Sequence, residues 1–187
     1  MLDVGIKSPV FMKFRGLLIL ALLLCAGFLA PPPARAEEMP KPSGNFRSTD
    51  LPLPRYVSLR SDMVYVRAGP DLRYPIKWIF RREGMPVEIV QEFEHWRKIK
   101  AIDGGEGWVH QSMLSGERKV LIKSESDPVP LREGFTKNAR MIARIEPMVV
   151  AGVDKCDSGW CRIEASGYRG WVERNFLWGI YDDEELN

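Results

Sequence analysis

Residues 64–69 read Val-Tyr-Val-Arg-Ala-Gly, and this stretch decides the fold because the chain repeats its pattern further on. Val129-Pro130-Leu131-Arg132-Glu133-Gly134 follows at an offset of 65 residues, with apolar residues, arginine and glycine in matching places. Two further blocks recur in the same order: Trp96-Arg97-Lys98-Ile99 as Trp160-Cys161-Arg162-Ile163, and Gly107-Trp108-Val109 as Gly170-Trp171-Val172. Three matched blocks in one order indicate a duplicated unit of about 63 residues.

Each copy has the pattern of short β-strands. Val64 and Val66 alternate with larger or charged neighbours, which is the period of two expected of a strand with one buried face. Proline and glycine turn signals bound the β-branched runs, and no apolar helical period lasts for three turns after the N-terminal segment. The sequence therefore predicts an all-β chain of two tandem small β-barrels, at residues 56–118 and 119–181. Residues 119–127 are expected to be a short connector.

Residues 1–36 are typical of a cleaved secretory signal. A basic start precedes an uncharged apolar run at residues 17–30, and the segment ends in the small-x-small pattern Ala-Arg-Ala. The alternative is a membrane anchor, but a spanning helix needs about 20 apolar residues and this run is shorter. We therefore expect a signal helix, cleavage after Ala36 and a periplasmic protein, with translation starting at Met1 or Met12.

The charge of the exported part is nearly balanced. Removal of the signal leaves 23 Lys and Arg against 24 Asp and Glu. This balance offers no electrostatic basis for binding nucleic acid, and after signal cleavage we expect no membrane insertion. Residues 37–55 are predicted to be a proline-rich linker, and residues 182–187 an acidic tail that is a solvated end.

Two cysteines remain after signal cleavage, Cys156 and Cys161, in the segment CDSGWC. An even pair in an oxidising compartment favours a disulfide, and the C-x4-C spacing suits two strands that meet at a tight turn. A thiol-exchange centre would prefer C-x-x-C. A zinc site would need further ligands, and the only histidines, His95 and His110, lie far off in sequence. We predict a structural disulfide, with no metal and no cofactor.

The order of these motifs resembles the bacterial Src-homology-3-like domain family. The first copy matches closely through VYVRAGPDLRYPI, EHWRKIK and GEGWVHQSML, and the second matches more loosely, without a proline after Gly134. The resemblance covers residues 56 to about 181 and extends to two-copy periplasmic proteins of Gram-negative bacteria. It implies half-open barrels of five or six strands and a binding role, often toward cell-wall peptidoglycan or peptides, but no reaction.

Aromatic residues of the first copy mark the predicted ligand site. If Ile99 and Val109 fill the barrel core, strand alternation places Trp96 and Trp108 on the outer face. With two nearby tyrosines they make up the predicted ligand-binding set, which is Tyr65, Tyr74, Trp96 and Trp108. The second copy, which lacks a counterpart of Tyr65 and carries the cysteines, is expected to serve as support. The alternative is that the outward tryptophans pack the two barrels together.

No catalytic constellation is visible, so we predict no enzyme. The cysteines belong to the second copy and the histidines to the first, which leaves no cysteine–histidine pair. Arg67 and Arg132 are expected to brace loops, and Trp78 and Trp178 to lie in a core or an interface. Two functions remain open. One is an exported non-catalytic binding module for peptidoglycan or an extended peptide, and the other is a scaffold or accessory subunit that docks another envelope protein through the barrel surfaces.

Overall fold

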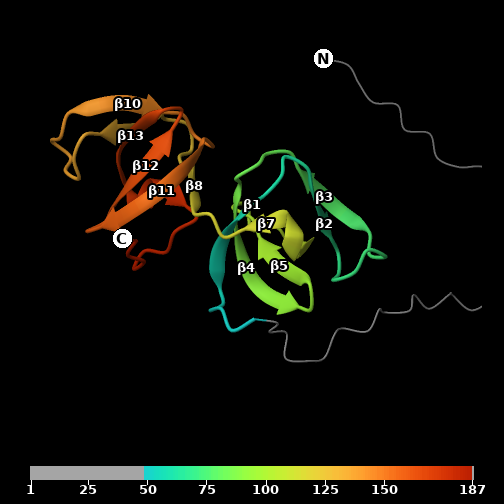
Figure 1. Cartoon of the computed structure of the whole chain (residues 1–187). Helices are drawn as coiled ribbons and strands as arrows, with labels where there is room; N and C mark the ends of the chain where they lie inside the picture. Colours follow the sequence, from blue (N-terminus) through green and yellow to red (C-terminus); the bar gives the residue numbers. More distant parts are fainter. Residues whose placement is uncertain (1–48, 187) are drawn as a thin grey trace, which may run out of the picture. The chain divides into compact units, whose positions relative to one another are not determined.

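The computed structural model describes residues 49–186 (Figure 1). These residues form two seven-stranded antiparallel sheets, and their helical content is two single-turn 3-10 helices. The all-β architecture of two tandem half-open barrels confirms the predicted fold class. The expected signal helix and its cleavage site lie outside the described residues.

The first barrel uses residues 55–115. Its strands follow one another in the order β3-β2-β6-β5-β4-β1-β7 across the sheet. Their bounds are β1 Arg55–Leu59, β2 Val64–Arg67, β3 Ile76–Phe80, β4 Pro86–Phe93, β5 Trp96–Lys100, β6 Glu106–His110 and β7 Leu114–Ser115, with the 3-10 helix η1 at Gln111–Met113. The sheet has seven strands where the family resemblance implies five or six, and the two-residue β7 is among them.

The second barrel repeats this arrangement strand for strand, in the order β10-β9-β13-β12-β11-β8-β14. Its elements are β8 Lys119–Ile122, β9 Val129–Arg132, β10 Met141–Ile145, β11 Val150–Asp157, β12 Trp160–Ala165, β13 Tyr168–Glu173, η2 Arg174–Phe176 and β14 Leu177–Trp178. Within residues 49–186 no strand pairs with a strand of the other sheet. The duplication seen in the sequence is therefore a duplication of complete, separately paired barrels.

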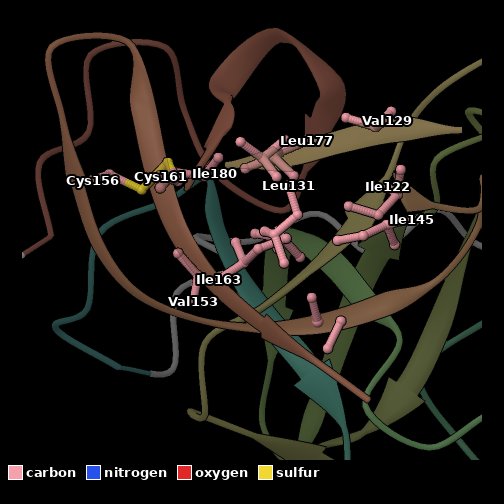
Figure 2. Close-up of a cluster of buried hydrophobic side chains, with 14 residues drawn as sticks. Ile122, Val129, Leu131, Ile145, Val153, Cys156, Cys161, Ile163, Leu177 and Ile180 are labelled. Carbon is pink, nitrogen blue, oxygen red and sulfur yellow. A yellow bond between two sulfur atoms is a disulfide. The ribbon is translucent and has the colours of Figure 1, made fainter. Parts of the chain in front are cut away.

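Strand alternation builds each core. In the first barrel Val64, Val66, Ile99 and Val109 are fully buried and belong to one apolar cluster, as the period of two predicts. The second barrel has a larger cluster, shown in Figure 2, in which Leu131, Ile163 and Leu177 occupy the middle. The sulfur atoms of its two cysteines lie on one side of this cluster, beside Ile180.

The repeated Gly-Trp-Val motif contains glycine because another strand passes close by. A Cβ atom on Gly107 would lie 2.4 Å from Val66 Cγ1, and one on Gly170 would lie 2.6 Å from the carbonyl oxygen of Arg132. Contacts this short are not tolerated, so any side chain at either position would push β2 or β9 away. The following tryptophan and valine then point to opposite faces of the strand.

Two expectations about the segments between and after the barrels are wrong. The expected connector at residues 119–127 begins with β8, whose Val120, Leu121 and Ile122 are fully buried and which pairs with β11 and β14. The part of the acidic tail that the structure describes is docked instead of solvated. The main-chain N–H of Cys156 donates to the carbonyl of Leu186, and Arg118 forms an ion pair with Glu184.

Side chains of the first sheet contact the end of the second. Tyr56 packs edge-on against Trp178, with ring centroids 5.3 Å apart, and lies 4.7 Å from the ring of Tyr181. The Tyr181 hydroxyl also donates to the Glu88 carboxylate at 2.9 Å. Trp178 is therefore an interface residue, while Trp78 packs on the core of the first barrel. Both placements agree with the expectation from sequence.

Candidate functional site

A groove of about 570 Å³ lies on the surface of the first barrel. Three segments line it: β2 with the loop that follows, the turn between β4 and β5, and the end of β6 with η1. The lining residues are Tyr65, Arg67, Asp71, Leu72, His95, Trp96, His110, Ser112 and Met113. The groove thus combines aromatic and apolar walls with imidazole, hydroxyl and charged groups, as ligand sites in proteins commonly do.

The groove brings together two of the four predicted site residues, Tyr65 and Trp96. Tyr65 is 43% exposed, so it is much more open to solvent than Trp96. Trp96 lies outside the core cluster, as strand alternation predicts, yet it is only 9% exposed. The ring of His110, which faces it across β5 and β6, packs edge-on at 5.5 Å between centroids. Trp96 therefore lines the groove but offers little free ring surface.

The other two predicted residues, Tyr74 and Trp108, do not line the groove. The Tyr74 ring fills the space over Gly69, where a Cβ would meet it at 2.6 Å, so it supports the loop after β2. Trp108 pairs across the sheet with Arg67 and Lys98 and is only 7% exposed. The low exposure of Trp108 does not agree with the expectation that it presents an open ring.

Arg67 and Arg132 brace loops, as expected. In the first barrel one guanidinium nitrogen of Arg67 donates to the carbonyls of Leu72 and Tyr74, both at 2.9 Å. In the second barrel Arg132 donates to the carbonyl of Ala139 at the same distance. Each arginine therefore holds the loop between its own strand and the next, which forms one wall of the groove in the first barrel.

A buried ion cluster lies next to the turn between β4 and β5. The Glu92 carboxylate is fully buried and accepts from Arg55 at 2.6 Å and from the main-chain N–H of Thr49 at 2.8 Å. Arg97 lies 3.3 Å from the same carboxylate. Burial lowers the pKa of the Arg97 guanidinium, and the Glu92 charge opposes that shift. This cluster fixes the strand that begins with Trp96.

Sequence reasoning missed the two histidines of the groove. From the sequence, His95 and His110 are considered as zinc ligands and as partners of a catalytic cysteine, but not as ligand-binding residues, although both fall in the copy that carries the predicted site. In the structure their ring centroids lie 6.1 Å apart. Nδ1 of His95 contacts the side-chain amide nitrogen of Gln111, and Nδ1 of His110 contacts the Ser112 hydroxyl at 2.8 Å. Their position next to Trp96 and after Trp108-Val109 was the available signal.

The second barrel does not reproduce this lining. At equivalent positions it replaces Tyr65 by Pro130, His95 by Gly159 and His110 by Glu173. Its repeated tryptophan Trp171 is instead in edge-on contact with Phe135, with ring centroids 5.4 Å apart. The imidazole and tyrosine groups that characterise the groove therefore belong to the first barrel.

In residues 49–186 no three side chains of His, Cys, Asp or Glu are gathered so that they could hold a metal ion. Cys156 and Cys161 face each other across β11 and β12, with their sulfur atoms at disulfide distance and their Cα atoms 4.1 Å apart. In the same residues no helix has the length and apolar character needed to cross a membrane.

Comparison with known families and proteins supports the duplicated fold. The family model described as bacterial SH3 domain matches residues 60–116 and 125–179, which is one match in each barrel. Among curated proteins the chain is similar to "Putative N-acetylmuramoyl-L-alanine amidase YrvJ" of Bacillus subtilis (strain 168), with 27% identity over 128 residues. The match covers 64% of this chain and 24% of that protein, so the chain spans about a quarter of the relative's length.

Two solved structures from Trichomonas vaginalis, NlpC1 and NlpC2, also show some likeness. Each is 14% identical to this chain and covers 70% of it, with TM-scores of 0.31 and 0.32. The chain covers 47% of the first and 50% of the second. At these scores the likeness adds nothing to the description of the groove.

Proposed function

The chain belongs to the bacterial SH3 domain family, and from this premise we propose that it is a cell-wall binding module whose ligand is the peptide part of peptidoglycan. The observation that carries the proposal is the groove of the first barrel, with the exposed ring of Tyr65 beside Trp96. The name of the Bacillus subtilis relative, an amidase of N-acetylmuramoyl-L-alanine, supports a muropeptide as the ligand class.

The shape of the groove favours an extended peptide over a stacked sugar. Sugars bind on open aromatic faces, and the rings of Trp96 and Trp108 are mostly covered. Leu72 and Met113, both exposed, provide apolar rims at which small aliphatic side chains of a peptide would be buried. Polar groups between these rims are available to the peptide backbone.

We propose that the module itself does not catalyse a reaction. The sulfur atoms of Cys156 and Cys161 lie at bonding distance from each other in the second barrel. The histidines lie in the first barrel, so no cysteine–histidine pair is assembled in the part of the chain that the structure describes. These placements support the proposed role in recognition, next to enzymes that act on the wall.

Binding to purified, protein-free sacculi tests the proposal. Tyr65→Ala should weaken retention about 30-fold, the equivalent of about 2 kcal/mol for an aromatic hot spot. Because Tyr65 is exposed, the variant should fold normally, whereas Trp96→Ala would also remove a mostly covered ring. Tyr168→Ala is the matched control, since Tyr168 is an exposed tyrosine of the second barrel. Equal retention of both variants, or no retention of the unaltered protein, would refute the proposal.

The proposed place of action requires export. We propose that residues 1–36 are removed on the way to the periplasm, in keeping with the basic start and apolar run of this segment. N-terminal sequencing of the protein from a periplasmic extract should begin at Glu37. Recovery of protein that retains Met1 or Met12 in the membrane fraction would contradict this expectation.

A second candidate function has an observation of its own. The edge strand β10 and the loop before it expose the apolar side chains Phe135, Met141 and Ile142 in the second barrel. Such a group suits the alternative of a scaffold that docks another envelope protein. This alternative predicts binding to envelope membranes that Ile142→Asp abolishes, together with no binding to protein-free sacculi.

A further inference from the structure

The orientation of one amide side chain determines where His95 carries its proton. A guanidinium nitrogen of Arg97 donates to Gln111 at 2.7 Å, and a guanidinium only donates, so the atom that accepts is the amide oxygen. The amide nitrogen of Gln111 then faces Nδ1 of His95 at 3.1 Å. Because that nitrogen only donates, Nδ1 of His95 accepts, and the neutral ring carries its proton on Nε2.

A hydrogen bond from the main chain determines the same tautomer for His110. The N–H of Ser112 donates to Nδ1 of His110 at 3.3 Å, in the first turn of η1. A main-chain N–H has no acceptor capacity, so Nδ1 of His110 is again an acceptor and its proton lies on Nε2. Two independent local networks therefore leave both imidazoles of the groove with an Nε2–H donor.

Both donors belong to side chains that line the groove. His95 comes from the turn between β4 and β5 and His110 from the end of β6, and both line the groove. Among the described residues no hydrogen bond engages either Nε2 atom, whereas Arg67 and Asp71 already have bonds to main-chain groups of the loop. The groove thus contains two imidazole donors that have no partner among the described residues, with ring centroids 6.1 Å apart.

We propose that His95 and His110 select a ligand that carries a carboxylate, which accepts one hydrogen bond from each Nε2–H. A carboxylate has two acceptor oxygens and no donor, and each hydrogen bond spans about 2.8 Å, which suits two separate donors. Bonds to an ionised acceptor are also stronger than neutral ones. The proposal rests on the groove being the ligand site, and it narrows the ligand class to peptides with a free carboxylate.

The first test is spectroscopic and needs no ligand. In the purified protein labelled with nitrogen-15 at histidine, long-range proton–nitrogen correlation spectra at neutral pH report the tautomer of each ring. Both histidines should show the Nε2–H form, and Gln111→Leu should release His95 into a mixture while leaving His110 unchanged. A dominant Nδ1–H form at His95 or His110 would overturn the proposal.

The second test measures binding of three N-acetylated alanine tetrapeptides by titration. One has a free C-terminal carboxylate, one a C-terminal amide, and one a C-terminal amide with a glutamate side chain at the last position. The amide peptide without glutamate should bind about tenfold more weakly than the free acid, because it loses a charge-assisted acceptor. The third peptide shows whether a side-chain carboxylate serves as well as a terminal one.

Variants at His95 separate the donor from the ring. His95→Phe should remove the preference for the free acid, and His95→Gln should largely restore it, since a glutamine amide nitrogen can replace Nε2–H. Equal affinity for acid and amide, or binding of none of the peptides, would overturn the carboxylate proposal even if sacculi still retain the protein. If the unaltered protein does not bind sacculi, the proposed function is refuted instead.

Discussion

At the scale of single residues, Trp96 shows why a pattern can predict a direction but not an exposure. Strand alternation correctly places its ring on the face opposite Ile99. The same alternation in β6 places His110 opposite it, and the imidazole covers part of the ring. Exposure therefore depends on the cross-strand neighbour, which is why the exposed Tyr65 is the better position for a binding test.

The cysteines provide a prediction at the same scale. Cys156 and Cys161 are register partners next to the tight turn between β11 and β12, so the fold alone brings them together. Free-thiol titration of the denatured, unreduced protein should find none. Cys156→Ala should lower the free energy of unfolding by about 2 kcal/mol, the value expected for so short a loop. Cys161→Ala in the Cys156→Ala background should then lower the free energy of unfolding by less than Cys161→Ala does in the unaltered protein.

Measurement by denaturant unfolding of the two single variants and the double variant checks this expectation. If the disulfide is the source of the stability, both single variants should lose the same free energy of unfolding, because either substitution removes the disulfide. Strictly additive losses, or two reactive thiols in freshly prepared periplasmic protein, would show that the two side chains contribute separately.

At the scale of an element, the C-terminal tail behaves as a docked segment of the second barrel. Arg174 donates to the carbonyl of Asp182, and Arg118 forms an ion pair with Glu184. Burial alone would raise the pKa of Glu184, but the hydrogen bonds from Arg118 and from the Tyr181 main chain, with the Arg118 charge, hold it below its usual range. The ionised form is the one that the folded protein favours.

The tail should therefore detach in acid before the barrels unfold. A carboxyl group with a lowered pKa stabilises the folded state above its ordinary value of about 4.3, and this contribution is lost as the pH falls through the lower folded pKa. Hydrogen exchange should show loss of protection at the Cys156 N–H, which donates to Leu186, in that acidic range. Glu184→Gln should show the same loss already at neutral pH.

Glu185→Gln is the matched control, because Glu185 is exposed in the same tail. It should keep both the protection at neutral pH and its acid dependence. Protection at Cys156 that does not change with pH in the unaltered protein would mean that the Arg118–Glu184 pair does not hold the tail.

At the scale of the whole molecule, the described residues contact one another across the two barrels through aromatic rings. Burial, together with the smaller effect of the negative charge on Glu88, raises the pKa of Tyr56 to about 12. Burial and the hydrogen bond to Glu88 also raise the pKa of Tyr181 well above its ordinary range. The folded protein therefore favours the protonated form of both hydroxyls.

The contact of Tyr56 with Trp178 and Tyr181 should weaken at alkaline pH. A raised tyrosine pKa stabilises the folded state below the ordinary value of about 10, and for Tyr56 the contribution is lost as the pH rises from there to about 12. Absorbance titration of tyrosinate should show late ionisation of two tyrosines, Tyr56 and Tyr181. Tyr56→Phe should remove one late step, whereas Tyr168→Phe should leave both late steps in place. A single transition for all the tyrosines would contradict the expectation.

Much of the fold is determined by the sequence alone, because its causes are local. The duplicated Gly-Trp-Val blocks, the alternation around Val64 and Val66, and the short C-x4-C loop each describe neighbours within one strand or one turn. Such patterns are sufficient to predict two tandem all-β barrels and a cysteine pair. They do not distinguish a connector from β8, because a short apolar run becomes a strand only when β11 and β14 lie beside it.

The lining of the groove was decided by the tertiary structure. Sequence reasoning places Tyr65 and Trp96 on the outer face of the first barrel, and both line the groove, while their role in ligand binding stays a prediction. Tyr74 and Trp108 do not line the groove, since the Tyr74 ring lies over Gly69 and Trp108 is mostly buried. His95 and His110 join it because the β4–β5 turn and the end of β6 meet in space. Contacts between residues distant along the chain have no periodicity, so only the folded molecule determines which side chains a ligand meets.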